Sequence, residues 1–410
     1  MSRRLLLFLF LIAISQWARP QQMALHDGDR VVFYGDSITA QRYYTRFVED
    51  FVLTRYPQLH VAFFNAGVPG DTVNGGYTGD TATRLKRDLF PHQPTVVTVM
   101  LGMNDGGYTQ FDQQYFDSYS SGYRKLLAAI QVGAPGARIT LISPTPYDEI
   151  TNGTEFPGYG ETIGRYAAFV KELAASSRLG FSDFHAAIVS LANSGMKENP
   201  SLAALLVPDR IHPSEAAQWA MAAALARDWG MSPVVCSVHL DAEKDAPVAT
   251  ENAQVTGLTA SDGKLQWTEL DGSLPLPLDL ENGMVRFVVN NSEVGAMDRE
   301  MLRVDRLAKP QYALKIDGHS IATFDREQLA AGVNLALYPT PMQGQARDVD
   351  GDEAKRTRLD EAHFILAVEP PQSGDESAAT AAIEARDQVL ATEERKTAQP
   401  VPHAFELDPE

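Results

Sequence analysis

The sequence predicts an α/β protein, with a parallel sheet covered by helices on both faces, followed by a β-rich region and an acidic helical tail. Short apolar runs alternate with helix-like stretches over residues 30–230, and Asp-Gly pairs flanked by alternating residues follow. Of the 410 residues, 44% are apolar, enough to offset the entropy lost on folding. We expect an α/β domain at 23–235, a small β-rich accessory domain at 236–345, and a helical or partly disordered acidic tail at 346–410.

The first 22 residues are typical of an export signal. Arg3 and Arg4 precede ten apolar residues, 5–14, and a short segment that ends in the small residue Ala18. This pattern predicts a signal peptide over residues 1–22. A membrane span requires about 20 apolar residues, so an uncleaved anchor is the weaker alternative. We therefore expect an exported protein, periplasmic or extracellular, with no stable membrane span.

Five short apolar runs in the first domain are separated by stretches whose apolar residues lie three and four positions apart. Strands that are apolar on both faces and joined through helices are typical of a parallel sheet between helical layers. An alanine-rich helix over about 214–229 is expected to end before Gly230 and Pro233. The strands are expected at residues 31–34, 60–65, 95–101, 138–143 and 180–184.

The region after the α/β domain has the signals of an antiparallel β structure. Asp-Gly between runs of alternating polarity is a strong hairpin signal. The alternation of Met284, Arg286 and Val288 is interpreted as a further strand, and the Pro-rich residues 274–278 as an extended crossing. The hairpins are expected at the Asp-Gly pairs that begin at residues 262, 271 and 317.

Half of the net charge is concentrated in the tail. The chain has 35 Lys and Arg against 53 Asp and Glu, a net charge of −18, and residues 346–410 contain 16 acidic and 7 basic side chains. The apolar pattern of the tail is thin, so two solvated helices are expected at about 352–368 and 378–396, with a partner-binding module as the alternative. Because phosphate recognition requires a basic face, the sequence argues against nucleic-acid binding.

Four polar loops follow strands or lie at the same end of the predicted sheet. Ligands of parallel sheets gather at the carboxyl ends of the strands, so the four loops are expected to meet there. One such loop alone would be a weak signal, and the ordered set of four is specific. The loops read Gly35-Asp36-Ser37-Ile38, Asn65-Ala66-Gly67-Val68-Pro69-Gly70-Asp71, Gly102-Met103-Asn104-Asp105 and Asp209-Arg210-Ile211-His212.

Together these four blocks resemble the SGNH hydrolases, also called GDSL esterases and lipases. The resemblance covers roughly residues 30–230, and the first block has isoleucine where the family has leucine. It implies a flavodoxin-like three-layer α/β/α fold, known as the SGNH hydrolase fold. The roles that it implies are Ser37 as nucleophile, His212 as base, Asp209 as the partner of His212, and an oxyanion hole made by the amides of Ser37 and Gly70 and the side chain of Asn104.

These residue types suit ester hydrolysis. A serine hydroxyl attacks an ester when a base takes its proton, and an imidazole with a pKa of about 6.5 can take and return it. The expected protein is an exported serine esterase that works through an acyl-enzyme on Ser37, with a slight preference for acetyl esters of carbohydrates. Small-molecule or polysaccharide esters are the expected partners. The alternatives are a lipase or lysophospholipase, an acyltransferase, and a non-catalytic cell-surface binding protein on the same fold.

Other patterns carry less weight. The run Ser194 to Lys197 fits the Ser-x-x-Lys pattern of penicillin-recognising enzymes, but the Ser-Asp-Asn and Lys-Thr-Gly partners are absent from the sequence. The nine histidines are scattered, with no His-Glu-x-x-His, so the sequence implies neither a metal nor another cofactor. Asp36 and Asp105 are expected to bind loop backbone. The only cysteine is Cys236, which excludes an intramolecular disulfide.

Overall fold

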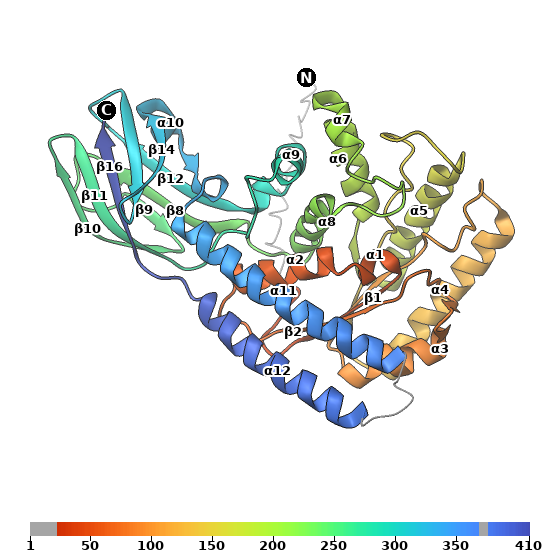
Figure 1. The fold of residues 1–410 in the computed structure, drawn as a ribbon. Coiled ribbons are helices and arrows are strands. Elements are labelled where there is room, and N and C mark those ends of the chain that lie inside the picture. Colours follow the sequence, from red (N-terminus) through yellow and green to blue (C-terminus); the bar gives the residue numbers. More distant parts are fainter. Residues whose placement is uncertain (1–22, 369–375) are drawn as a thin grey trace, which may run out of the picture.

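The computed structural model describes residues 23–368 and 376–410, so the predicted signal peptide lies outside the described residues. The α/β part and a β-rich part form two lobes, and the two long helices α11 (Pro341–Val368) and α12 (Glu376–Thr397) run side by side below them (Figure 1). None of the helices in the described ranges combines the length and apolar character that crossing a bilayer demands.

A five-stranded parallel sheet forms the centre of the α/β lobe. Its strand order, β2-β1-β5-β6-β7, is the flavodoxin-like order, in which ligands bind where the order reverses, here between β1 and β5. Gly35 at the end of β1 is level with Gly67 of β2 and Met100 of β5, so the loops that follow these strands leave the sheet together. The expected strands are all present: β1 (Arg30–Gly35), β2 (Ala62–Gly67), β5 (Val96–Met100), β6 (Arg138–Ile142) and β7 (Gly180–Ser182).

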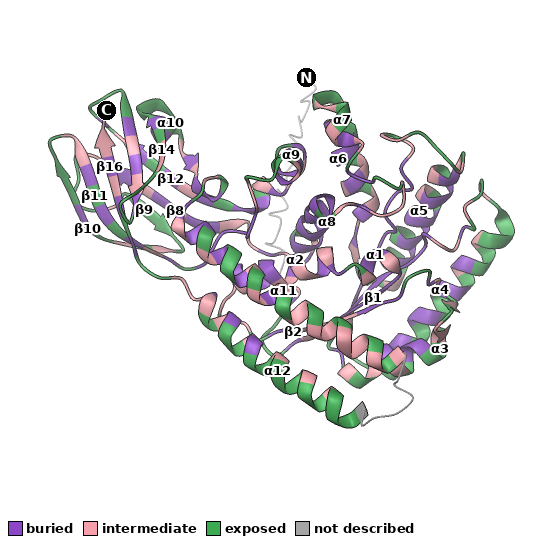
Figure 2. Ribbon diagram, in the orientation of Figure 1, coloured by how far each residue is buried: buried purple, intermediate pink, exposed green. Residues whose placement is uncertain are grey.

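Each face of the sheet packs against its own helices, as the sequence predicted. Val31 and Phe33 pack in one apolar cluster with α2, α6 and α8, whereas Val32 and Tyr34 point to the other face and pack with α4 and α5. Both clusters are closed to solvent (Figure 2). The helices are α1 (Ser37–Ala40), α2 (Tyr43–Arg55), α3 (Thr81–Arg84), α4 (Gln113–Gly133), α5 (Tyr159–Ser177), α6 (Phe184–Glu198), α7 (Pro200–Ala203) and α8 (Glu215–Asp228).

The β-rich lobe consists of two facing sheets. Two of the three expected hairpins form, at Asp262-Gly263 and Asp317-Gly318, where all four residues have positive φ. The sheets have the orders β10-β11-β16-β13-β14 and β15-β12-β8-β9. Their strands are β8 (Val234–Asp241), β9 (Ala249–Glu251), β10 (Ala253–Ser261), β11 (Lys264–Asp271), β12 (Arg299–Asp305), β13 (Gln311–Ile316), β14 (His319–Asp325), β15 (Val333–Asn334) and β16 (His403–Pro409), and the short β3 (Gly75–Gly76) and β4 (Gly79–Asp80) pair in the α/β lobe.

Two predictions for this lobe were wrong. The third Asp-Gly pair, at residue 271, ends β11, and the chain then crosses to the α/β lobe through residues 274–278. The alternating run predicted as a strand is part of helix α9 (Gly283–Asn291). Asn282 caps this helix, and the residues at 285, 288 and 289 are buried at helical spacing, which outweighs the alternation.

The acidic tail is helical but is not separate from the rest of the protein. Helix α11 begins five residues before the expected boundary at residue 346 and packs against α2, where Arg46 forms an ion pair with Asp350. After α12, which is largely exposed in Figure 2, the chain returns as β16 between β11 and β13. Because β16 is a central strand, residues 403–409 belong to the β-rich lobe and not to the tail.

Candidate active site

Ser37 lies where β1 meets helix α1. Gly35 ends the strand, Asp36 caps the helix by accepting a hydrogen bond from the amide of Ile38, and Ser37 is the first helical residue. Gly67 lets this turn sit close to β2, because a Cβ on Gly67 would come within 2.3 Å of the backbone nitrogen of Ala40. The result is a serine held on rigid backbone at the carboxyl edge of the sheet.

His212 and Asp209 reach the serine from the loop before α8. Ser37 Oγ is 2.8 Å from His212 Nε2, and His212 Nδ1 is 2.6 Å from Asp209 Oδ2. The other carboxylate oxygen of Asp209 accepts hydrogen bonds from the amides of Ile211 and His212. Arg210, which lies between Asp209 and Ile211 in the chain, has a φ of 69°. Partial burial raises the pKa of Asp209, but the hydrogen bonds from His212 and Ile211 outweigh it, so the pKa lies below the ordinary value. Asp209 is therefore a carboxylate beside the imidazole at neutral pH.

Gly70 and Asn104 lie in the two neighbouring loops. The amide of Val68 donates to the carbonyl of Gly35, which ties the Gly70 loop to the end of β1. Gly70 has a φ of 74°, a conformation that favours glycine. Asn104 Nδ2 donates to the carbonyl of Asp71 at 2.9 Å, so the two loops are joined, but within the described chain no hydrogen bond links either residue to Ser37.

Two residues that hold these loops were missed by sequence reasoning. The hydroxyl of Tyr108 donates to Asn104 Oδ1 at 2.9 Å and restrains the rotation of the amide group. Arg84 is fully buried and binds Asp71, Asp88 and the carbonyl of Ala66, below the Gly70 loop. Neither residue belongs to a motif block, and a charged residue in α3 gives no local sign that it will be buried.

Buried carboxyl groups lie directly behind the site. Asp36 and Asp105 bind loop backbone as expected, Asp105 by accepting from the amide of Val73. Burial raises the pKa of Asp105 to about 8, although the Val73 amide lowers it, and the nearby carboxylates of Asp36 and Asp71 raise it further. Burial likewise raises the pKa of Asp36 to about 7. These groups hold protons more strongly in the folded protein than in the unfolded chain.

The raised pKa of Asp105 predicts a pH-dependent stability. The contribution of this group is fully present below its unfolded pKa of 3.8 and is lost as pH rises through about 8, at most about 1.4 kcal/mol per pH unit. The Asp105→Asn variant has no carboxyl group at this position and does not lose this stabilisation as pH rises. The free energy of unfolding of the variant, relative to that of the wild type, is therefore expected to increase between about pH 5 and pH 8. Urea unfolding of both proteins measures the difference. Exposed Asp245→Asn is the control, and equal pH dependence in the Asp105→Asn variant and the wild type would contradict the prediction.

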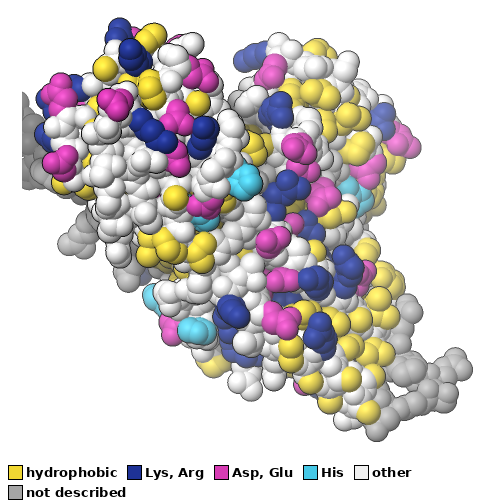
Figure 3. Space-filling view, turned by 60° about the vertical axis from the view of Figure 1, so that its left-hand side comes forward, with side chains coloured by type: hydrophobic (Ala, Val, Ile, Leu, Met, Phe, Trp, Pro, Cys, Tyr) yellow, Lys and Arg dark blue, Asp and Glu magenta, His cyan; other side chains and the backbone are white. Residues whose placement is uncertain are grey.

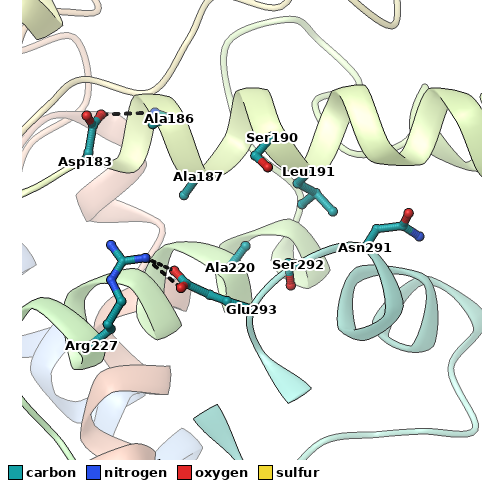
Figure 4. A pocket seen from close by; sticks show the side chains of 10 residues that line it. All are labelled: Asp183, Ala186, Ala187, Ser190, Leu191, Ala220, Arg227, Asn291, Ser292 and Glu293. Atoms are coloured by element: carbon teal, nitrogen blue, oxygen red, sulfur yellow. Dashed lines mark hydrogen bonds and ion pairs between the residues drawn. The ribbon is translucent and has the colours of Figure 1, made fainter. Parts of the chain in front are cut away.

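The site is open to solvent. The side chain of Asp209 is 53% exposed and that of His212 29% exposed. A cavity of about 310 Å³ lies elsewhere, between α6, α8 and α9, where Arg227 is paired with Glu293 (Figure 4). A larger cavity of about 630 Å³ lies beneath α11 and α12. Ser37 is not among the residues that line either cavity.

On the face drawn in Figure 3, acidic and basic side chains are interspersed, and no basic stripe is visible.

The comparisons with known proteins differ in how much of the chain they cover. Residues 33–220 match the GDSL-like lipase/acylhydrolase family, and all five candidate site residues lie in this range. An acetylxylan esterase of Geobacillus stearothermophilus is 27% identical over 230 residues, which are 51% of this chain and 97% of that protein. Its crystal structure covers 51% of this chain and 98% of its own, with a TM-score of 0.42. The structure of a gut microbial diltiazem-metabolizing enzyme is 25% identical and covers 95% of this chain and 99% of its own, with a TM-score of 0.81.

Proposed function

The chain contains a GDSL-like lipase/acylhydrolase domain and is an ester-hydrolysing enzyme, and from this premise we propose that it is a serine esterase that acts through an acyl-enzyme on Ser37. The observation that carries the proposal is the continuous contact from Ser37 Oγ to His212 Nε2 and from His212 Nδ1 to Asp209. A binding protein that had lost the reaction would not need all three groups within hydrogen-bond reach.

We assign a step to each group. Asp209 accepts a hydrogen bond from the Nδ1–H group of His212, which leaves Nε2 as the base that faces Ser37 Oγ. As the serine attacks the ester carbon, His212 takes its proton and then gives it to the leaving alcohol. Water attacks the acyl-enzyme in the same way, and Ser37 is regenerated.

The oxyanion of each tetrahedral intermediate needs donors that are already in place. We assign this role to the amides of Ser37 and Gly70, which donate no hydrogen bond to other described residues, and to the side chain of Asn104. One hydrogen of Asn104 Nδ2 binds the carbonyl of Asp71, and the second remains for the substrate oxygen. Tyr108 acts as a positioning residue because it holds the other end of the same amide.

The preferred substrates that we propose are acetyl esters of carbohydrates. The similarity to an acetylxylan esterase supports this choice. The exposure of Asp209 and His212 is compatible with this choice, because an acetyl group needs no long apolar pocket and a bulky carbohydrate needs an open site. Lipase or lysophospholipase activity and acyl transfer to a hydroxyl acceptor are the competing outcomes.

A substrate panel tests this choice. Initial rates are compared on nitrophenyl esters of increasing acyl length, on acetylated xylo-oligosaccharides and on a lysophospholipid. We expect the highest kcat/KM on acetyl esters and acetate release from the oligosaccharides. A preference for long acyl chains would contradict the acetyl assignment, and an acylated sugar as main product would favour transfer. An organophosphorus inhibitor is expected to label Ser37 alone, and mass spectrometry that located it on another serine would remove the nucleophile assignment.

Export through residues 1–22 is part of the same proposal. The expected result is a mature chain, shortened at its N-terminus, in the periplasmic or extracellular fraction of the expressing cells. N-terminal sequencing of that protein measures the cleavage, and a full-length chain found only in the cytoplasm would contradict it.

A further inference from the structure

The β-rich lobe contains a buried group of metal-ligand side chains that the esterase site does not use. The residues that point between its two sheets are apolar along most of each strand, such as Leu302 and Val304 of β12. At one end of these strands, the inward-pointing residues are instead acidic residues and a cysteine. The group is Cys236 of β8, Glu269 and Asp271 of β11, and Glu300 of β12.

Strand pairing brings the four side chains together. Cys236 and Glu300 are direct partners in the register of β8 and β12, whereas Glu269 and Asp271 lie two residues apart on β11 and so share one face. One ligand atom each of Cys236, Asp271 and Glu300 lies within 4.8 Å of the other two. Cys236 Sγ is also 3.9 Å from Glu269 Oε1. Two facing sheets therefore contribute to one cluster.

The cluster is buried and poorly satisfied. Cys236 and Glu300 are each 1% exposed, and Asp271 is 5% exposed. Among the described residues, neither carboxylate oxygen of Glu300 has a hydrogen-bond partner, and Asp271 Oδ1 has none either. The contrast with Glu269 is informative, because that side chain accepts a hydrogen bond from Trp267 Nε1 at 2.7 Å. Glu300 is thus a buried carboxyl group beside a thiol and a second carboxyl group, and neither of its oxygens has a partner among the described residues.

Two arrangements could relieve such a cluster. The first is protonation, in which the thiol and the carboxyl groups share hydrogen bonds, as the Cys236 thiol does with Glu269. In the structure as it stands, neither oxygen of Glu300 has a hydrogen-bond partner among the described residues. A bound cation would satisfy these oxygens together, because each carboxylate and the thiolate would become a ligand.

The donor types identify the cation. Ca²⁺ and Mg²⁺ take oxygen ligands, so a thiol in the centre of the cluster disfavours both. Zn²⁺ accepts cysteine sulfur, carboxylate oxygen and imidazole nitrogen. His403 of β16 is the register partner of Glu269, and its Nε2 is buried without a partner in the described chain. Because directly paired residues share a face of the sheet, its side chain lies on the same face as Glu269 and Asp271 and could supply a fourth ligand.

We propose that Cys236, Asp271 and Glu300 bind a structural Zn²⁺ ion that joins the two sheets of the β-rich lobe. Glu269 completes the acidic surroundings, and His403 is the candidate fourth ligand. The sequence had implied no metal, because these ligands come from strands far apart in the chain and form no short motif. The site lies next to the lobe junction, where Asp298, two residues before Glu300, pairs with buried Arg55 of α2.

Cobalt substitution of the mature protein tests the proposal. The protein is treated with a chelator, dialysed and titrated with Co²⁺, whose bond to a thiolate gives a charge-transfer absorption. Cys236 is the only cysteine, so any such band reports this residue. We expect a band that saturates at one equivalent, proton release on binding, and displacement of the band by one equivalent of Zn²⁺. Zn²⁺ is also expected to raise the melting temperature of the chelated protein.

Isosteric variants locate the site. Cys236→Ser is expected to abolish the band and Glu300→Gln to weaken Co²⁺ binding by about tenfold or more. Glu353→Gln changes another buried glutamate, in α11, and is expected to bind Co²⁺ as the wild type does. A cooperative thermal unfolding transition verifies that each variant is folded, and hydrolysis of a nitrophenyl ester verifies that the α/β lobe, which contains Ser37, is intact.

Three results would overturn the proposal. The first is a chelated wild-type protein that shows no thiolate band and no change of melting temperature with Zn²⁺. The second is equal Co²⁺ affinity in folded Glu300→Gln and wild type. The third is a saturating band that one equivalent of Zn²⁺ fails to displace. Because the band in the wild type is decisive by itself, the test holds even where a variant does not fold.

Discussion

Ser37→Ala is expected to lower kcat for ester hydrolysis by about four to six orders of magnitude. The hydroxyl of Ser37 is the only nucleophile in contact with His212 Nε2 among the described residues, and its loss leaves the imidazole with no proton to take. The oxyanion donors and the rest of the site remain, so a small rate above that of water is expected to persist. KM is expected to change little, because the hydroxyl contributes little to binding of the ester.

The control for this prediction is Ser194→Ala. Ser194 starts the Ser-x-x-Lys run and is half-buried in α6, where its hydroxyl donates to Asn291. If the esterase site is the one described, this variant keeps wild-type kcat. Steady-state kinetics on a nitrophenyl acetate measure both variants, and a Ser37→Ala protein with more than a few per cent of wild-type kcat would refute the acyl-enzyme at Ser37.

Asn104→Ala is expected to lower kcat by about 100- to 1000-fold with little change in KM. The side-chain amide is fixed at both ends, by the carbonyl of Asp71 and by the hydroxyl of Tyr108, so its free hydrogen costs no reorganisation when the oxyanion forms. A donor of this kind acts mainly on the transition state, which is why the effect falls on kcat. A fall in kcat/KM carried by KM alone would contradict the oxyanion role.

Two further variants separate the donor from its surroundings. Tyr108→Phe removes one hydrogen bond of the amide and keeps the donor, so a loss of about fivefold is expected, in line with about 1 kcal/mol for one hydrogen bond. Asn74→Ala changes an exposed asparagine whose amide reaches only Ser118, at 3.3 Å, and is expected to keep wild-type kcat. Equal losses in the Asn104→Ala and Tyr108→Phe variants would indicate a structural effect on the loop.

The sequence predicted the α/β lobe well because that lobe follows local rules. Buried parallel strands are apolar throughout, helices repeat every three to four residues, and the switch between the two periods marks each element. Ser214 and Asp112 cap α8 and α4 as helix start signals should. The order of the strands and the level ends of β1, β2 and β5 then bring the polar blocks to one edge.

Prediction was weaker where an element depends on distant partners. The segment 283–291 alternates like a strand, yet the burial of one helical face decides its structure. The segment 403–409 is short and follows an acidic helical stretch in the sequence, and it is a strand because β11 and β13 pair with it from both sides. Such pairing energy comes from residues about 90 to 140 positions away, and no local pattern of the segment contains it.

The sequence by itself determined the elements of the α/β lobe, the four polar blocks and the interpretation of those blocks as an ester-cleaving site, because each depends on residue types and spacings within short stretches. The tertiary structure decided the contact of Ser37 with His212, the burial of Arg84 under the Gly70 loop, and the meeting of Cys236, Asp271 and Glu300 between two sheets. The physical reason is that hydrogen bonds, burial and shared charge depend on distances across the fold, and strand register and helix packing set those distances only when the whole chain is assembled.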